Sequence, residues 1–129
     1  MTRNQRRRVL ILDPERDTAE LFARALETHV HECKCYWVQT PGEARSLFIE
    51  IPFDFVLADF SLLQKEHFVL IDQIRKTSSK TVILVDAYLN QKEYLEKVIK
   101  MGAAGYFIKP IMINSLRKLI DDFALSLIV

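Results

Sequence analysis

The sequence predicts an α/β fold in which a mostly parallel sheet is covered on both faces by helices. Five short apolar runs alternate along the chain with five segments whose apolar residues recur at helical spacing. The apolar runs are continuous rather than alternating, which is typical of strands buried on both faces. Alternation of strand and helix favours parallel pairing, and right-handed crossovers then leave few topologies.

Each predicted strand is short, and four of the five end at a charged residue. The strands are expected at residues 9–12, 35–38, 53–58, 81–85 and 106–108. The residues that follow the first, third, fourth and fifth strands are Asp13, Asp59, Asp86 and Lys109.

The five predicted helices are supported by their terminal residues and by their apolar stripes. The terminal signals are Asp13-Pro14 as a start, Thr40 with Glu43 as a capping box, Asn90 with Glu93 and Asn114 as further starts, and Gly102 as a stop. The expected stripes are Ala19, Phe22, Ala25 and Leu26; Ala44, Leu47, Phe48 and Ile51; Val69, Leu70 and Ile74, in a helix over about 66–76; Leu95, Val98 and Ile99; and Leu116, Leu119, Ile120, Phe123 and Leu127.

Composition and charge narrow the class of protein. The chain has 129 residues, half of them apolar and 27% charged, as in a soluble single domain. Its net charge of +1 gives no general case for nucleic-acid binding. Four arginines fall within the first eight residues, so we expect a basic disordered tail over 1–7 and one domain over 8–129. No apolar run is long enough for a membrane span or a signal peptide, and two cysteines make no disulfide framework, so a cytoplasmic location is expected.

The charged residues at the strand ends suggest a chemical site. Because parallel strands point the same way, Asp13, Asp59, Asp86 and Lys109 should meet at one edge of the sheet. Carboxylates of this kind suit Mg²⁺, a carboxylate can attack phosphorus to form an acyl phosphate, and an ammonium can neutralise the transferred group. Each residue also has a purely structural reading, as a helix cap, a loop cap or a turn. That reading is weakest for Asp59, because burying a carboxylate without a partner is costly.

Three stretches, 9–13, 53–59 and 102–110, resemble the receiver domain of bacterial two-component response regulators, and the resemblance extends over about residues 8–125. The resemblance implies a flavodoxin-like (βα)5 fold, a doubly wound parallel sheet with strand order 2-1-3-4-5. It implies a cytoplasmic signalling domain rather than an enzyme, with at most self-phosphorylation and self-dephosphorylation.

The resemblance also implies roles for individual residues. Asp59 would accept a phosphoryl group from a histidine kinase or phosphotransfer protein. Asp13 and the backbone carbonyl of Ser61 would bind Mg²⁺ together with Asp59, and Lys109 would contact the phosphoryl group. Tyr106 would be the aromatic side chain that moves between inactive and active states.

The chain departs from the family pattern at two positions of the expected site. Pro14 stands where the family usually has a second acid, which leaves Glu15 as a candidate metal ligand. Asp86 stands where the family has Ser or Thr, and an ionised carboxylate cannot donate a hydrogen bond to a phosphoryl group. It would also repel that group, by about 1 kcal/mol at 4 Å in water and about 4 kcal/mol at an intermediate dielectric. Asp86 would instead be able to pair with Lys109.

A third departure lies after Asp59, where Leu63 and His67 replace the family's usual proline and glycine, so the loop should take another path. We therefore hypothesise an atypical receiver. The alternative is a pseudo-receiver that acts as a phosphorylation-independent protein-interaction module. A flavodoxin is disfavoured, because residues 14–17 lack the hydroxyl groups of a flavin phosphate loop.

The expected partners follow from the same resemblance and from the length of the chain. No residues remain for a DNA-binding output domain, so the target would be a downstream protein or a missing domain, with no direct nucleic-acid binding. A homodimer through the fourth helix, fifth strand and fifth helix is a further expectation. The kinase and the stimulus are not encoded in any motif.

A second cluster, His29, His31, Cys33 and Cys35, invites a zinc hypothesis. In an extended strand these side chains would span about 20 Å at roughly 3.3 Å per residue. Zinc ligands lie about 2.0–2.3 Å from one point, so one strand cannot supply all four. We therefore expect small, buried free thiols at the entry to the second strand.

Overall fold

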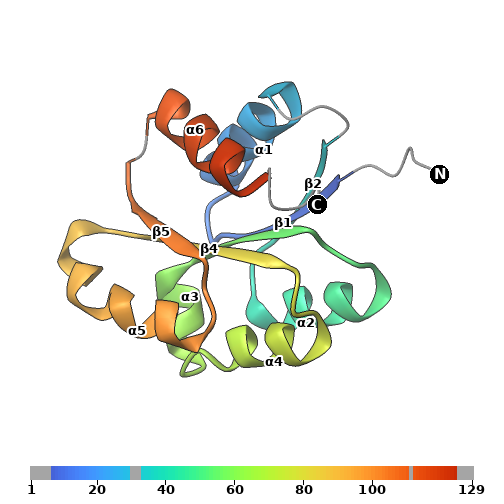
Figure 1. The fold of residues 1–129 in the computed structure, drawn as a ribbon, viewed down its shortest axis with the longest axis vertical. Coiled ribbons are helices and arrows are strands. Elements are labelled where there is room, and N and C mark those ends of the chain that lie inside the picture. Colours follow the sequence, from blue (N-terminus) through green and yellow to red (C-terminus); the bar gives the residue numbers. More distant parts are fainter. Residues whose placement is uncertain (1–6, 30–32, 111, 125–129) are drawn as a thin grey trace.

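The computed structural model describes residues 7–29, 33–110 and 112–124, which form a five-stranded parallel sheet between two layers of helices (Figure 1). The strands are β1 (Arg7–Leu12), β2 (Cys33–Val38), β3 (Phe55–Asp59), β4 (Val82–Ala87) and β5 (Gly105–Ile108). They lie in the order β2-β1-β3-β4-β5 and every neighbouring pair is parallel. The predicted flavodoxin-like fold is confirmed.

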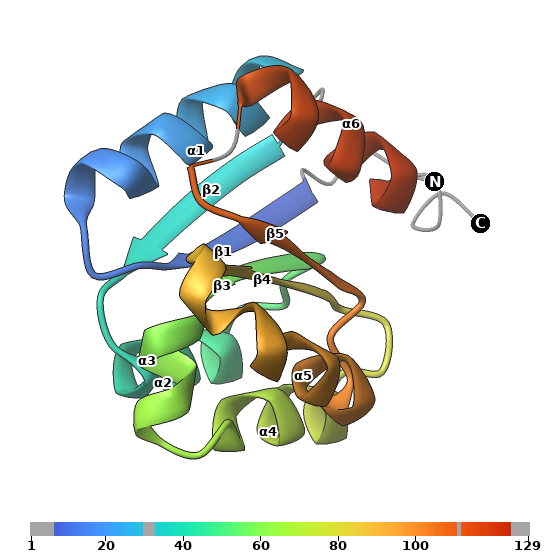
Figure 2. The same cartoon turned by 90° about the vertical axis from the view of Figure 1, so that its left-hand side faces the viewer.

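The helices divide between the two faces of the sheet, as Figures 1 and 2 show. Their bounds are α1 (Arg16–His29), α2 (Pro41–Glu50), α3 (Phe60–Lys65), α4 (Val69–Thr77), the 3-10 helix η1 (Leu89–Tyr94), α5 (Leu95–Met101) and α6 (Ile113–Ala124). Helices α1 and α6 cover one face, and α2, α3, α4 and α5 cover the other.

Continuous apolar strands place the core on both sides of the central sheet. Leu10 and Val56 face the α2–α5 layer, whereas Ile11 and Leu57 face the layer of α1 and α6. All four side chains are at most 1% exposed. This two-sided burial explains why the strand sequences do not alternate in polarity.

Two of the predicted helix signals are found where expected. Thr40 caps α2, since its Oγ1 accepts a hydrogen bond from the Glu43 N–H at 3.1 Å. The Glu43 carboxylate accepts from the Thr40 hydroxyl and from the Gln39 N–H, both at 3.2 Å, so the backbone half of the box is displaced by one residue. Gly102 ends α5 at φ 126°, a backbone conformation that favours glycine.

Three other start signals were wrong, since the helices begin at other residues. Asn90 lies inside η1, which starts after Tyr88, and Asn114 lies in the first turn of α6 rather than before it. Helix α1 begins at Arg16, so Asp13 is not its cap, and the Asp13 Oδ1 accepts the Glu15 N–H at 2.8 Å instead.

The segment after Asp59 differs most from the prediction. It forms a sixth α-helix, α3, before the third predicted helix, which begins only at Val69. His67 and Phe68 adopt left-handed backbone conformations at φ 53° and 62°, which separate α3 from α4. Because α4 starts later than predicted, Val69 is 45% exposed instead of facing the core. Ile99, expected on an inner stripe, is 38% exposed.

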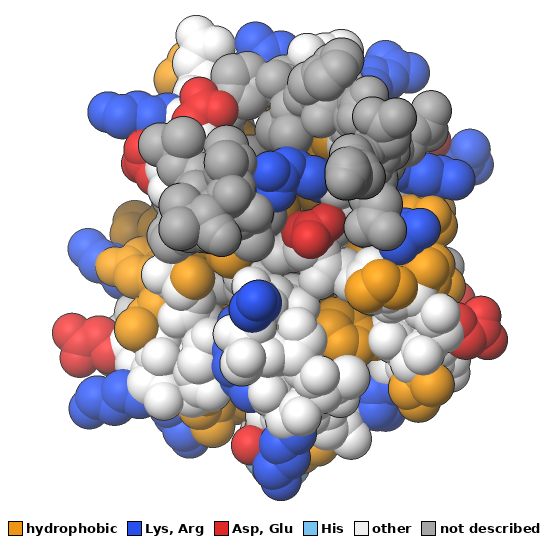
Figure 3. Space-filling view, turned by 45° about the vertical axis from the view of Figure 1, so that its right-hand side comes forward, with side chains coloured by type: hydrophobic (Ala, Val, Ile, Leu, Met, Phe, Trp, Pro, Cys, Tyr) orange, Lys and Arg blue, Asp and Glu red, His pale blue; other side chains and the backbone are white. Residues whose placement is uncertain are grey.

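Some predictions fall outside the described residues. These are residues 1–6 of the basic tail that was predicted over 1–7, His31, and the chain after Ala124, including Leu127; Arg7, the last residue of that predicted tail, begins β1. The side chains of His29, Leu119, Ile120 and Phe123 are also outside the description. Within the described part, no helix is both long and apolar enough to cross a membrane. On the face shown in Figure 3, lysine and arginine side chains are spread among acidic and apolar ones, in keeping with the near-zero net charge.

Candidate functional site

Four charged residues meet at the carboxyl edge of the sheet, as their positions after the strands predicted. Asp59 ends β3 and pairs in register with Asp86 of β4. Asp13 follows β1, and Lys109 follows β5. The three carboxylates are at most 4% exposed as residues, and the Lys109 side chain is 9% exposed. The fold therefore buries three acids and one cation together.

Lys109 lies at the centre of this acidic site, which comprises Asp13, Asp59, Asp86 and Lys109. Its Nζ is 2.8 Å from Asp59 Oδ1, 3.1 Å from Asp86 Oδ2 and 3.8 Å from Asp13 Oδ2. One oxygen from each carboxylate lies within 4.8 Å of the others. A single ammonium thus faces three acids, which leaves an excess of negative charge when all three are ionised.

The hydrogen bonds of the site are unevenly distributed. Asp59 uses both oxygens: Oδ1 accepts from Lys109 Nζ, and Oδ2 accepts from the Leu62 N–H at 3.0 Å, which caps α3. In contrast, Asp13 Oδ2 and Asp86 Oδ2 are buried and face Lys109 Nζ as ion pairs, without accepting a hydrogen bond from the described residues. These oxygens have acceptor capacity left for another cation or a proton.

Burial and charge shift the pKa values in the site. Burial raises the pKa of Asp86 to about 7, although Lys109 opposes this rise. Burial also raises the pKa of Asp13. Burial alone would lower the pKa of Lys109, but the facing carboxylates outweigh it and raise that pKa above its usual value. Lys109 therefore stays charged, and the group that gains or loses a proton near neutrality is Asp86.

The donor set fits a hard divalent cation. Asp13, Asp59 and Asp86 supply clustered carboxylate oxygens, two of which lack hydrogen bonds. Asp86 thereby restores the third acid that Pro14, which is exposed, cannot supply. Glu15 is also exposed.

Ser61, whose backbone carbonyl was predicted to bind Mg²⁺, lies in the first turn of α3, two residues after Asp59. Its hydroxyl accepts a hydrogen bond from Gln91 Nε2 at 2.9 Å.

Two aromatic residues that sequence reasoning missed contact the site. Lys109 Nζ lies 5.1 Å from the centre of the Tyr88 ring, which is half-exposed. The Trp37 Nε1–H donates to the Asp13 carbonyl at 2.9 Å. Tyr88 follows Asp86 by two residues, which was the available signal for it; Trp37 comes from β2, and nothing in the sequence links it to Asp13.

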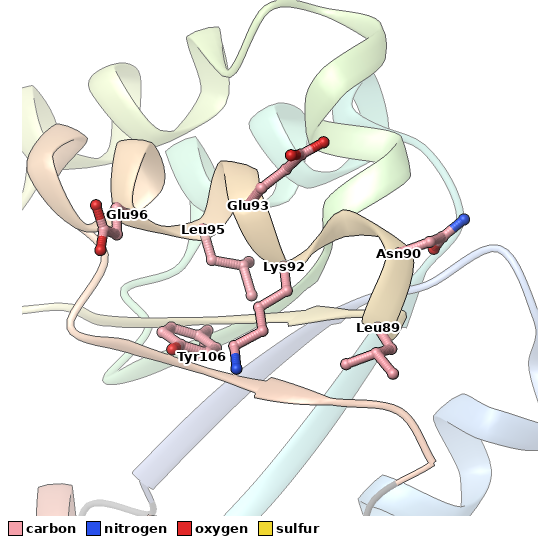
Figure 4. Close-up of a pocket in the computed structure, with 7 residues that line it drawn as sticks. All are labelled: Leu89, Asn90, Lys92, Glu93, Leu95, Glu96 and Tyr106. Carbon is pink, nitrogen blue, oxygen red and sulfur yellow. The ribbon is translucent and has the colours of Figure 1, made fainter.

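Tyr106 lies outside the acidic site, on β5, and is 38% exposed. It lines a groove of about 610 Å³ between β5 and the segment that contains η1 and the start of α5 (Figure 4). The other lining residues are Leu89, Asn90, Lys92, Glu93, Leu95 and Glu96. In Figure 4 the Lys92 side chain extends toward β5 beside the Tyr106 ring, and Glu93 points away from it.

The cysteines of β2 are free, as expected. Cys33 is buried and Cys35 is half-buried, with its Sγ 3.9 Å from the Ala23 carbonyl oxygen. Among the described residues, the carboxylate cluster is the group that could hold a metal, and the two thiols are not part of such a group. The disfavoured zinc hypothesis gains no support.

Comparison with known proteins assigns the chain to a family. A family model described as the response regulator receiver domain matches residues 9–121. A curated relative, the two-component response regulator ARR10 of Arabidopsis thaliana, is 27% identical over 117 residues. The match covers 87% of this chain but only 20% of the relative, so the chain spans about a fifth of that protein's length.

Solved structures agree on the fold. A response regulator from Thermotoga maritima superposes with a TM-score of 0.82 at 24% identity, covering 92% of this chain and 97% of that one. A two-component response regulator from Clostridium difficile superposes with a TM-score of 0.84 at 18% identity, covering 95% of this chain and 98% of that one. Chemotaxis response regulator CheY4 of Vibrio cholerae superposes with a TM-score of 0.81 at 18% identity, covering 92% of this chain and 99% of that one. The chain belongs to the response regulator receiver domain family of two-component signalling.

Proposed function

We propose that Asp59 is the phosphoacceptor of this receiver domain. An oxygen of its carboxylate forms the new bond to phosphorus, the P–N bond of a phosphohistidine donor breaks, and the bonding electrons return to the donor imidazole. The donor is a histidine kinase or a phosphotransfer protein. The observation that carries the proposal is the 2.8 Å contact between Lys109 Nζ and Asp59 Oδ1 inside a buried acidic site. The ammonium is in place to balance charge on the transferred group.

Asp13, Asp59 and Asp86 would hold Mg²⁺ in this site. The ion would neutralise negative charge on the phosphoryl oxygens. Glu15 is a secondary candidate ligand, since it adjoins Asp13 in sequence and is exposed. The Ser61 backbone carbonyl, two residues after Asp59, is a further proposed ligand.

Asp86 makes the receiver atypical. Its Oδ2 lies 3.1 Å from Lys109 Nζ, so it competes for the cation that a phosphoryl group would contact. When ionised it repels the phosphoryl group and has no proton to donate to it. The adduct at Asp59 is therefore weak. Because position 86 is an aspartate, it has no hydroxyl that could link the adduct to Tyr106.

The proposed output is a change at the surface around Tyr106. The groove beside Tyr106 is lined by apolar Leu89 and Leu95 and by charged Lys92, Glu93 and Glu96. Such a surface suits a downstream protein or an output domain, or a second copy of the chain contacting α5, β5 and α6. We place the protein in the cytoplasm, with self-phosphorylation and self-dephosphorylation as its only chemistry.

Intact-mass measurement after incubation with acetyl phosphate and Mg²⁺ tests the acceptor. We expect the mass of one phosphoryl group to be added to the parent, and no addition to Asp59→Asn. Asp72→Asn is the matched control, because Asp72 is an exposed acid on α4 that pairs only with Lys76 in the described structure. A mass addition that persists in Asp59→Asn would overturn the assignment.

A second candidate function is a phosphorylation-independent interaction module on the same fold. The specific observation in its favour is that both Asp59 oxygens and the Lys109 ammonium already have partners within the site. Absence of any adduct across a Mg²⁺ titration would favour this module over the phosphoacceptor.

A further inference from the structure

Helix α3 and the 3-10 helix η1 are joined by one side chain, that of Gln91. Its Nε2 donates to Ser61 Oγ at 2.9 Å, and its Oε1 accepts from the Tyr88 N–H at 2.9 Å. Gln91 therefore ties the segment after β4 to the first turn of the helix that follows β3. We refer to Gln91, Ser61 and Tyr88 as the latch.

The α3 end of the latch depends directly on Asp59. The Asp59 carboxylate caps α3 through the Leu62 N–H, one residue beyond Ser61. A hydrogen bond to an ionised carboxylate is roughly twice as strong as one to a neutral acceptor. When the carboxylate becomes an acyl phosphate, its capping oxygen no longer carries the carboxylate charge, so the cap on the first turn of α3 weakens.

The other end of the latch lies at the groove. Leu89 and Asn90, which line the groove with Tyr106, are in η1 beside Gln91. Phe60 adds an apolar contact between the same two elements, since its ring stacks on Tyr94 with centroids 6.3 Å apart. A shift in the first turn of α3 therefore has a direct route to the lining of the groove.

We propose that the latch carries the state of Asp59 to the groove beside Tyr106, through Ser61 and Gln91, without a hydroxyl at position 86. Gln91 is a positioning residue in this scheme, since it touches neither the acceptor nor a phosphoryl group. The inference rests on the proposed function, because phosphorylation of Asp59 is the signal that the latch would carry. The hydrogen bonds of the latch are present in the unmodified protein.

Amide hydrogen exchange over residues 88–94 tests the coupling in two arms. The first compares Asp59→Ala, which removes the α3 cap, with Asp59→Asn, which removes the charge but keeps a capping oxygen. We expect exchange in 88–94 to be about fivefold faster in Asp59→Ala, as loss of one hydrogen bond in a local opening predicts. Asp59→Asn should speed exchange by a smaller factor, because it keeps a cap but a weaker, uncharged one.

The second arm removes the latch and asks whether the response survives. Gln91→Leu and Ser61→Ala should abolish the difference between Asp59→Ala and Asp59→Asn, because coupled sites are not additive. Gln91→Glu should retain it, since a carboxylate can accept from both the Tyr88 N–H and the Ser61 hydroxyl. Gln64→Leu, on the exposed side of α3, is the matched control and should retain it as well.

The same exchange measurement is then made on protein phosphorylated with acetyl phosphate and Mg²⁺, with occupancy read by intact mass. The parent should show faster exchange in 88–94, and Gln91→Leu should show no further change at equal occupancy. An equal response of the parent and Gln91→Leu in either arm would overturn the latch. If no adduct forms, the proposed function fails, and the Asp59→Ala arm still decides the coupling.

Discussion

At the scale of single residues, the balance between Asp86 and Lys109 distinguishes this site. Three buried carboxylates surround one ammonium, and two of their oxygens have no hydrogen bond from the described residues. Burying charge is unfavourable unless each group is paired. The fold therefore holds a site that is short of positive charge, which is what a metal ion or a proton relieves.

The raised pKa values predict how stability depends on pH. Asp86 has a pKa of about 7 in the fold against 3.8 as the ordinary value, and that of Asp13 is also raised. The folded protein thus binds more protons than the unfolded chain over this range, so stability falls as the pH rises from about 4 to about 7.

Asp86→Asn should flatten this dependence and raise the free energy of unfolding at pH 8 by on the order of 1–3 kcal/mol. Urea denaturation of the parent and of Asp86→Asn between pH 5 and pH 8 measures this pH dependence of the free energy of unfolding. Asp72→Asn is the exposed control. An Asp86→Asn protein that keeps the full slope of the parent would show that Asp86 is not the titrating group.

At the scale of elements, helix ends explain both the successes and the errors of prediction. Thr40 and Gly102 were read correctly because each acts through its own backbone surroundings. Helix α3 could not be foreseen, because its cap is the Asp59 side chain, whose position depends on Lys109 fifty residues away. Local propensity at Asn90 was likewise overridden, since η1 starts after Tyr88, whose N–H donates to a Gln91 side chain that also contacts Ser61.

Arg75 fixes the end of α5 relative to α4 and β4. Its guanidinium donates to backbone carbonyls on both sides, those of Gly102, Ser78, Ser79 and Thr81. A Cβ added at Gly102 would lie 2.8 Å from the Arg75 Cγ, at a φ that side chains rarely adopt. The glycine is thus required both by backbone conformation and by packing.

Gly102→Ala should therefore lower the free energy of unfolding by about 2 kcal/mol. Gly42→Ala is the matched control, since its Cβ would meet nothing closer than 3.9 Å and it lies in α2. That substitution should be neutral or stabilise by up to about 1 kcal/mol. Equal effects of the two substitutions in urea denaturation would contradict this explanation.

At the scale of the whole molecule, the parallel sheet is what assembles the site. The strand order brings the ends of β1, β3, β4 and β5 to one edge, so residues nearly a hundred positions apart become neighbours. This convergence could be predicted from the strand ends alone, because it follows from the direction of parallel strands. The charged members of the site were therefore accessible to sequence reasoning.

The side-chain contacts around those charged residues could not be predicted from the sequence. The Tyr88 ring over Lys109 and the Trp37 hydrogen bond to Asp13 come from side-chain directions. The latch likewise depends on two segments separated by thirty residues. Strand pattern determines where backbone ends converge, whereas such contacts depend on packing that no local pattern encodes.

The central claim is that Asp86 weakens an acceptor site that is otherwise complete. Its most direct test is the acetyl phosphate concentration that gives half occupancy of Asp59, read by intact mass across a Mg²⁺ titration, in the parent and in Asp86→Thr. At saturating Mg²⁺, where loss of the Asp86 ligand no longer limits metal occupancy, removing a repulsion of about 1 to 4 kcal/mol should lower that concentration by roughly fivefold or more. Asp72→Thr should leave it unchanged. Equal half-occupancy concentrations for Asp86→Thr and the parent would contradict the account.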